Sequence, residues 1–131
     1  MIVPVATVIK FDRNGGPIKV SLTFDTMFLC TYELDLRESN GNPSVPPFPV
    51  SGDNTNPEKD EYDLPVPVVS NDGRTVLEFI NVLDEQGGGG QYQCTMTFTQ
   101  DGNTLGSVTT KLKQISGNLS HELLAARLVA K

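Results

Sequence analysis

Residues 87–99 read GGGGQYQCTMTFT, four glycines followed by a run in which every second side chain is apolar. Tyr92, Cys94, Met96 and Phe98 fall on one face of this run, and the glutamines and threonines between them fall on the other. Strict alternation of this kind is typical of a strand in an antiparallel sheet that has one buried and one solvated face. The stretch therefore predicts an all-β fold.

The same period-2 pattern recurs along the chain and predicts seven strands. Asn-Gly, Asp-Gly and similar pairs, which favour tight turns, separate several of the apolar runs. We expect strands at residues 2–11, 18–25, 28–37, 62–69, 75–83, 91–99 and 103–115. In the last of these the apolar phase changes between Leu105 and Val108, which predicts a β-bulge near Gly106.

Composition fits one small domain. The chain has 131 residues, of which 37% are hydrophobic and 20% are charged, and its formal net charge is −6. A chain of this length can bury a core without a metal or a disulfide. An acidic surface opposes the phosphate contacts on which nonspecific nucleic-acid binding depends, so we expect no nucleic-acid partner. No apolar run reaches the roughly 18 residues that a spanning helix needs, so we expect no membrane association.

The strand pattern is interrupted once in the middle and changes at the end. Residues 38–61 are rich in proline and acidic residues and predict a long loop after the third strand. The β-sandwich domain is expected to cover residues 1–116. Residues 117–131, GNLSHELLAARLVAK, combine a candidate N-cap at Ser120 with strong helix formers, which predicts a short C-terminal helix. A last edge strand at residues 126–130 is the alternative.

The segment that leads into the opening stretch resembles one corner of immunoglobulin-like domains. A strand beginning near Leu77 runs through a corner into Tyr92-x-Cys94. Between strands E and F of that family, a tyrosine two residues before a cysteine hydrogen-bonds back across the corner. The resemblance implies a seven-stranded antiparallel immunoglobulin-like β-sandwich with Tyr92 as the corner tyrosine. Glycines would let the backbone turn tightly between the two sheets.

The two cysteines, Cys30 and Cys94, both face inward by the alternation. In the family numbering of strands they fall on strands C and F, which are neighbours in one sheet. A disulfide between them would close a long loop and stabilise the fold by about 4 kcal/mol in the chain-entropy model. Two buried free thiols that act as small hydrophobic groups are the favoured alternative. Two cysteines alone leave the redox compartment undetermined.

Residues that carry catalysis or bind metals are sparse. The single histidine, His121, rules out a paired-histidine site, and no cysteine cluster has zinc spacing. We therefore expect no catalytic, cofactor-binding or metal-binding residue, and no enzyme. An acidic cluster offers oxygen ligands for Ca²⁺, but a solvated loop is favoured because its spacing differs from that of an EF-hand. The cluster comprises Asp53, Glu58, Asp60, Glu61 and Asp63.

Absence of catalytic chemistry favours a non-enzymatic interaction or structural module. A protein partner, or a second copy of the chain, would bind through the loops, the polar sheet face or the C-terminal tail. The candidate partner face carries Thr95, Thr97, Lys111 and Lys113, on a sheet built from the third, sixth and seventh strands. The alternative is a small β-barrel that binds a hydrophobic small ligand among inward aromatic side chains.

Overall fold

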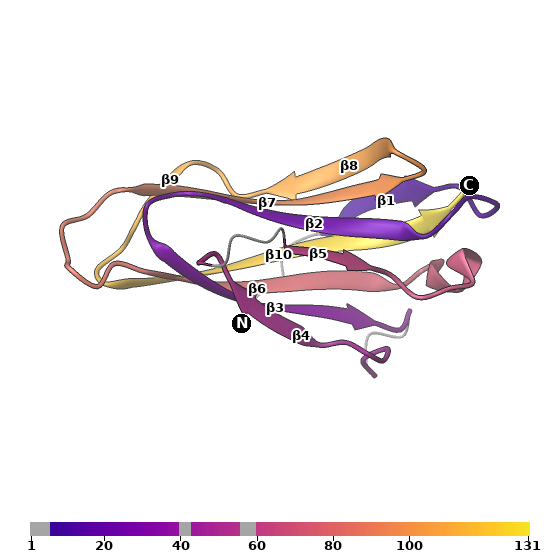
Figure 1. Cartoon of the computed structure of the whole chain (residues 1–131), viewed down its shortest axis with the longest axis horizontal. Helices are drawn as coiled ribbons and strands as arrows, with labels where there is room; N and C mark the ends of the chain where they lie inside the picture. Colours follow the sequence, from indigo (N-terminus) through magenta and orange to yellow (C-terminus); the bar gives the residue numbers. More distant parts are fainter. Residues whose placement is uncertain (1–5, 40–42, 56–59) are drawn as a thin grey trace.

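Two β-sheets packed face to face make up the protein, as the computed structural model shows over residues 6–39, 43–55 and 60–131 (Figure 1). The elements are β1 (Thr7–Phe11), β2 (Ile18–Asp25), β3 (Leu29–Arg37), β4 (Val50–Asp53), β5 (Asp60–Asp63), the 3-10 helix η1 (Val68–Asn71), β6 (Thr75–Leu83), β7 (Gln91–Gln100), β8 (Asn103–Thr109), β9 (Lys113–Gln114) and β10 (Leu119–Ala130). The described part is all-β, as predicted, but it has ten strands rather than seven.

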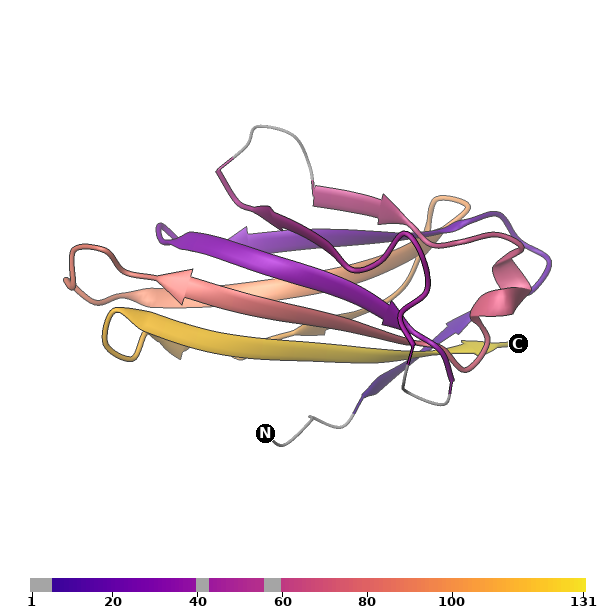
Figure 2. The same ribbon diagram turned by 90° about the horizontal axis from the view of Figure 1, so that it is seen from below.

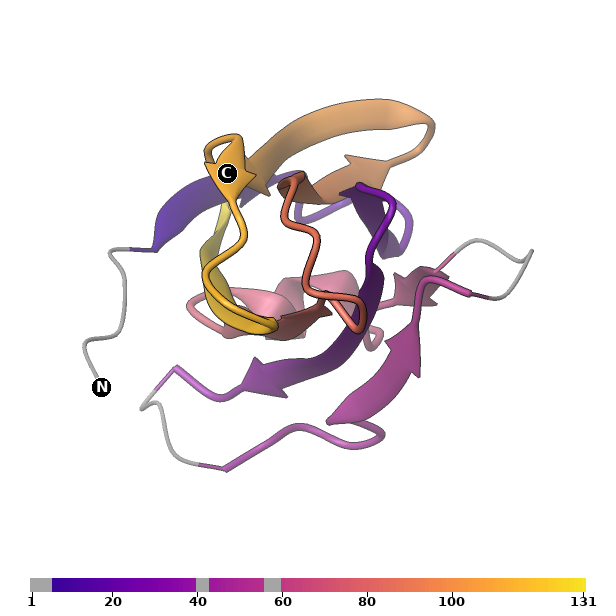
Figure 3. The ribbon, with the colours of Figure 1, turned by 90° about the vertical axis from the view of Figure 1, so that its left-hand side faces the viewer.

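The strands divide into two layers, which we call sheet A and sheet B. Sheet A has the order β1–β10–β6–β3–β4, and sheet B has the order β5–β2–β7–β8, with β9 pairing to β7. Neighbours are antiparallel except β1 and β10, which run parallel. Figure 2 looks onto sheet A, and the end view in Figure 3 shows the two layers. The described strands form two sheets rather than one closed barrel, so the barrel alternative was wrong.

The opening stretch forms β7, which lies between β2 and β8 in sheet B. Its alternation is confirmed, because its four inward apolar side chains are buried and the residues between them are more exposed. In the pairing with β8, Phe98 lies opposite Gly106 but Thr99 lies opposite Thr104, so Leu105 is an extra residue. The bulge predicted near Gly106 is therefore confirmed.

Residues 84–90 carry the chain from β6 in sheet A to β7 in sheet B. The Asp84 carboxylate accepts hydrogen bonds from the backbone N–H groups of Gly87 at 3.0 Å and Gly89 at 2.7 Å. Gly87, Gly89 and Gly90 have φ values of 69°, 79° and 145°, a region that favours glycine. The glycines thus allow the turn between sheets that the sequence predicts.

The predicted C-terminal helix was wrong, because residues Leu119–Ala130 form β10. β10 pairs with β6 from Leu119 to Arg127 and with β1 from Ala126 to Ala130. Alternate side chains, including Leu124 and Leu128, are buried in the core. Intrinsic helix propensity differs by less than about 1 kcal/mol per residue, so pairing and burial override it. The tail is a central strand of the sandwich and not a segment appended after the β domain.

The segment 38–61, predicted as a loop, is partly structured. It contains β4, which pairs with β3, and the first residues of β5, which pairs with β2. Val45 and Phe48, from its proline-rich part, are buried against the core. Residues 40–42 and 56–59 lie outside the described residues.

The strand predicted at residues 62–69 is β5, which ends at Asp63. It lies at the edge of sheet B, as expected for a strand followed by prolines that cannot donate ladder hydrogen bonds. Beyond it the chain forms η1, and the Asn71 side chain donates to the Pro65 carbonyl at 2.9 Å. The prolines therefore shorten the strand and start the connection to β6.

The core lies between the sheets and contains both cysteines. Cys30 is on β3 in sheet A, whereas Cys94 is on β7 in sheet B. The expectation that their strands are neighbours in one sheet was wrong, because β3 pairs with β4 and β6 instead. Both are fully buried free thiols. The hydrogen bond between the two thiols, followed by burial, raises the pKa of Cys94, and the same hydrogen bond lowers the pKa of Cys30.

Candidate functional site

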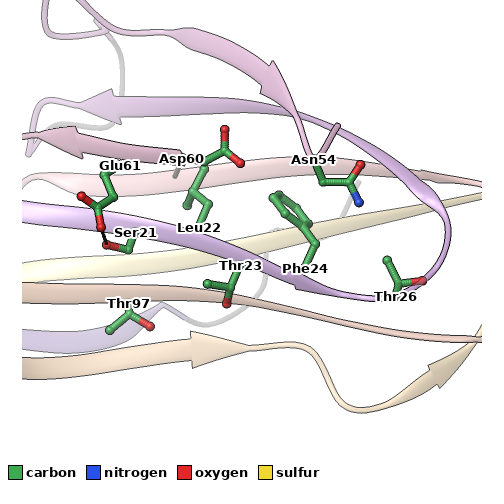
Figure 4. A pocket seen from close by; sticks show the side chains of 9 residues that line it. All are labelled: Ser21, Leu22, Thr23, Phe24, Thr26, Asn54, Asp60, Glu61 and Thr97. Carbon is green, nitrogen blue, oxygen red and sulfur yellow. Dashed lines mark hydrogen bonds between the residues drawn. The ribbon is translucent and has the colours of Figure 1, made fainter. Parts of the chain in front are cut away.

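Two hollows lie at the lateral sides of the sandwich, where an edge of sheet A faces an edge of sheet B. The first, which we call the β5 hollow, has a volume of about 620 Å³ and lies beside β2 at the end of β5 (Figure 4). Its lining residues are Ser21, Leu22, Thr23, Phe24, Thr26, Asn54, Asp60, Glu61 and Thr97. It combines an aromatic ring with hydroxyl, amide and carboxylate groups.

A tyrosine of sheet A closes the side of the sandwich beside the β5 hollow. The Tyr32 hydroxyl donates to Asp60 Oδ1 at 2.8 Å and lies 2.6 Å from the Tyr62 hydroxyl, both on β5 of sheet B. The Tyr32 ring stacks on Phe24 with ring centroids 5.8 Å apart. Burial, followed by these hydrogen bonds, raises the pKa of Tyr32. The phenol therefore stays protonated and links the two sheets.

Gly52 makes room for this link. It lies opposite Tyr32 in the pairing of β4 with β3, and a Cβ atom at Gly52 would stand 2.5 Å from the Tyr32 hydroxyl oxygen. Because Gly52 has no side chain, the Tyr32 ring can extend past β4, at the edge of sheet A, and reach β5. The glycine is therefore part of how this side closes.

Most polar groups of the β5 hollow already serve the fold. The Asn54 side chain donates to the Phe28 carbonyl at 2.9 Å and accepts from the Cys30 N–H at 2.9 Å. The Thr26 hydroxyl accepts from the Phe28 N–H at 3.1 Å and donates to the Gln91 carbonyl at 3.2 Å. Bonds that hold loops in place leave little capacity for a ligand. The hollow is large, but most of its polar side chains form hydrogen bonds that hold the fold together.

The second hollow, which we call the β10 groove, lies between the end of β8 and the first half of β10 and measures about 490 Å³. Val108, Leu123 and Leu124 supply apolar surface, and Lys111 and Lys113 supply positive charge. The full lining set is Val108, Thr109, Thr110, Lys111, Lys113, Glu122, Leu123, Leu124 and Ala125. In this groove, β10 lies beside Lys111 and Lys113, the two lysines of the candidate partner face.

An ion pair bounds one end of the β10 groove. Lys113 Nζ lies 2.6 Å from Glu122 Oε1, and the Tyr92 hydroxyl donates to the same carboxylate at 2.9 Å. Burial, and then the hydrogen bond to Glu122, raises the pKa of Tyr92 to about 12. Tyr92 thus bonds to a side chain of β10 rather than to backbone across its corner. This contact joins sheet B to sheet A.

The backbone edge of β10 in the groove has no strand beside it among the described residues. The N–H of Leu128 donates to the Arg74 carbonyl on the β6 side. Because successive residues of a strand point their N–H and C=O groups to opposite sides, His121 and Leu123 point away from β6. β1 runs along that side only from Ala126 onward. The Leu123 groups therefore face the groove, and the His121 groups lie on the same edge of β10, next to the residues that line it.

The four residues of the candidate partner face do not lie on one face. Thr95 and Thr97 are on the outer surface of sheet B, where the Thr95 and Thr109 hydroxyls are 2.8 Å apart. Lys111 and Lys113 lie at the lateral side, in the β10 groove. β3, which was expected in the same sheet, belongs to sheet A because it pairs with β6. The lysines line the groove, and Thr95 borders it through Thr109, which lines the groove as well, whereas Thr97 lies further along β7.

The acidic cluster is spread over two strands. Asp53 ends β4 and bonds the backbone and hydroxyl of Thr55, which lowers the pKa of its carboxyl group. Asp60, Glu61 and Asp63 are on β5, and Glu58 lies outside the described residues. Within residues 6–39, 43–55 and 60–131, no group of three or more His, Cys, Asp or Glu side chains is arranged to hold a metal ion.

Glu78 is the group that sequence reasoning missed. It points from β6 into the core, is fully buried, and has no hydrogen-bond partner for either carboxylate oxygen among the described residues. Burial raises its pKa to about 8. It shares the inward face of β6 with Val76 and Ile80, but Leu77 on the other face is buried as well, so alternation alone did not reveal which face points inward. It lines neither hollow.

In the described part of the chain, no helix has the length and apolar character needed to cross a membrane.

Together, the described residues form a two-sheet β-sandwich in which the first half of β10 has no described strand on the side of the groove. Comparison of the chain with protein-family models, with curated proteins and with solved structures finds no match. The fold class therefore rests on the strand pairing.

Proposed function

We propose that the protein is a non-enzymatic interaction module that binds a protein partner along the open edge of β10. The observation that supports this function is the outward placement of the backbone groups of Leu123, which lines the β10 groove, and of His121 on the same edge. Neither has a neighbouring strand in the described chain. Unpaired edge groups are a template for an added strand, because main-chain hydrogen bonds supply affinity and alternate side chains supply specificity.

The other sheet edges offer less to a partner. β4 and β5 each have four residues, β1 has five, and β8 carries the bulge that shifts its register. Short and bulged edge strands resist pairing with another chain. β10 has twelve residues and is held on its other side by β6, so its first half is an edge supported by a neighbouring strand.

Potentially reactive side chains favour an interaction role over an enzymatic one. Both thiols and the Glu78 carboxyl group are fully buried, and none of them lines the β5 hollow or the β10 groove. A nucleophile or general base needs contact with its substrate. An immunoglobulin-like relationship remains a prediction, which the two-sheet fold and the corner before Tyr92 support.

Amide hydrogen exchange measured by NMR tests the proposal. The probe is an acetylated, amidated seven-residue peptide in which threonine and valine alternate. In the free protein we expect fast exchange at His121 and Leu123, and addition of the peptide should slow both. The Ser51 amide, on the outer edge of β4, is the internal control, and a glycine–serine peptide of equal length is the control for the probe.

Three outcomes are informative. Protection of His121 and Leu123 by the threonine–valine peptide alone supports strand addition. Protection that rises with protein concentration, before any peptide is added, identifies a second copy of the chain as the partner. Slow exchange at both amides in a dilute monomer, or no change at millimolar peptide, overturns the proposal.

A further inference from the structure

We infer that the segment recognised at the β10 groove is acidic as well as extended. This inference rests on the proposed function and adds the chemistry of the partner. It follows from the charge and the shape of the groove, which differ from those of the chain as a whole.

The groove carries positive charge on a negative protein. The chain has a formal net charge of −6, yet the groove is lined by two lysines and one carboxylate. Lys113 is paired with Glu122, whereas Lys111 is exposed and has no salt-bridge partner among the described residues. A negative segment would gain from Lys111 at this place on the surface. A basic segment would face a like charge here.

The shape of the groove favours alternating side chains. An added strand points successive residues to opposite faces, so one set would meet Val108 and Leu124 while the other set points outward. Leu112, between the two lysines in sequence, is 58% exposed and offers further apolar surface. An extended segment with valine-like residues alternating with aspartate or glutamate would satisfy the backbone edge, the apolar lining and the lysine together.

Fluorescence anisotropy with labelled peptides tests the inference. Three seven-residue probes share alternating valines and carry aspartate, asparagine or lysine at the intervening positions. We expect the aspartate peptide to bind about 3- to 10-fold more tightly than the asparagine peptide, and the lysine peptide to bind more weakly than either. Raising the salt concentration should reduce the preference for aspartate, because screening weakens interactions between exposed charges.

A matched pair of variants locates the charge effect. Lys111→Ala should remove about half or more of the aspartate preference, measured as the ratio of the affinities of the aspartate and asparagine peptides for the same variant. Lys10→Ala changes the net charge equally, but it alters an exposed lysine of β1 that does not line the groove. It should leave the preference unchanged.

N-methylation of the aspartate peptide tests strand addition itself. Methyl groups on one alternate set of amides should weaken binding by roughly tenfold or more, and methyl groups on the other set should not, because only one set faces β10. Equal effects from both sets would overturn addition to the edge.

Failure of the inference and failure of the proposed function are distinguishable. Equal affinities for the aspartate and asparagine peptides would overturn the acidic partner and leave strand binding in place. Absence of binding by all three peptides, with exchange at His121 and Leu123 unchanged, would overturn both.

Discussion

The two lateral sides of the sandwich each bring a tyrosine to a carboxylate, but they close in different ways. Beside the β5 hollow, Tyr32 bonds to Asp60 and Tyr62, and β5 covers the edge of β2 as far as Leu22. Beside the β10 groove, Tyr92 bonds to Glu122, while the edge of β10 near Leu123 has no described strand next to it.

This difference separates a structural hollow from the groove at which we propose that a partner binds. A polar group that already has a partner in the fold gives a ligand little, whereas a solvated backbone group can exchange water for a partner at a net gain of about 0.5–1.5 kcal/mol. The larger hollow is therefore the less promising site. Volume alone would rank the two sides in the opposite order from the one we propose.

Glu78, in the core between the two sides, differs from Asp60 and Glu122 because no tyrosine or lysine among the described residues bonds to its carboxyl group. Its folded pKa is raised from 4.5 to about 8, while in the unfolded chain it ionises near the ordinary value. The free energy of unfolding is therefore expected to be greatest below about pH 4.5 and to fall as the pH rises toward 8. The total loss is on the order of 4–5 kcal/mol, since each pKa unit corresponds to about 1.36 kcal/mol.

Glu78→Leu should remove this loss, because leucine fills a similar space without a charge. Urea denaturation at pH 5, 6.5 and 8 is the measurement, and we expect the variant to exceed the parent most at pH 8. Glu33→Gln, at an exposed acid of β3, is the matched control. Parallel pH profiles for the parent and Glu78→Leu would contradict the burial of an unpartnered carboxyl group.

Gly52→Ala should break the closure beside the β5 hollow. The new Cβ would stand 2.5 Å from the Tyr32 hydroxyl and 2.7 Å from its Cζ atom, and Tyr32 is only 4% exposed. We expect a loss of about 2–3 kcal/mol in the free energy of unfolding, because overpacking forces the ring from its place. Gly88→Ala, where nothing lies within 4 Å of the added Cβ, should change stability by less than about 0.5 kcal/mol.

Removal of one hydroxyl on each side compares the two closures directly. Tyr32→Phe should cost about 2 kcal/mol, because it leaves Asp60 and Tyr62 without their shared partner. Tyr92→Phe should cost about 1 kcal/mol, because Glu122 keeps its ion pair with Lys113. Thermal and urea denaturation of both variants measure the difference. Equal losses would indicate that the ion pair does not compensate for the missing hydroxyl.

Several elements of the fold were predictable from local pattern. The alternation in β7, the bulge at Leu105 and the glycine turn before Gln91 all follow from features within a few residues. The lysines of the groove were also singled out, but together with Thr95 and Thr97 on a different surface. The local pattern thus identified the charged residues but did not predict which residues lie next to them in the fold.

By itself, the sequence determined that the chain is built mainly from β-strands, because period-2 alternation reports which side chains are buried. That the described strands form two packed sheets rather than a barrel was decided by the tertiary structure. Only the tertiary structure decided that residues 119–130 are strand β10, that β3 lies in the sheet opposite β7, and that the edge at His121 borders a groove. The physical reason is that backbone hydrogen bonds join any two strands alike. The choice of neighbour, which depends on packing across the whole core, then overrides the local helix preference of the C-terminal residues.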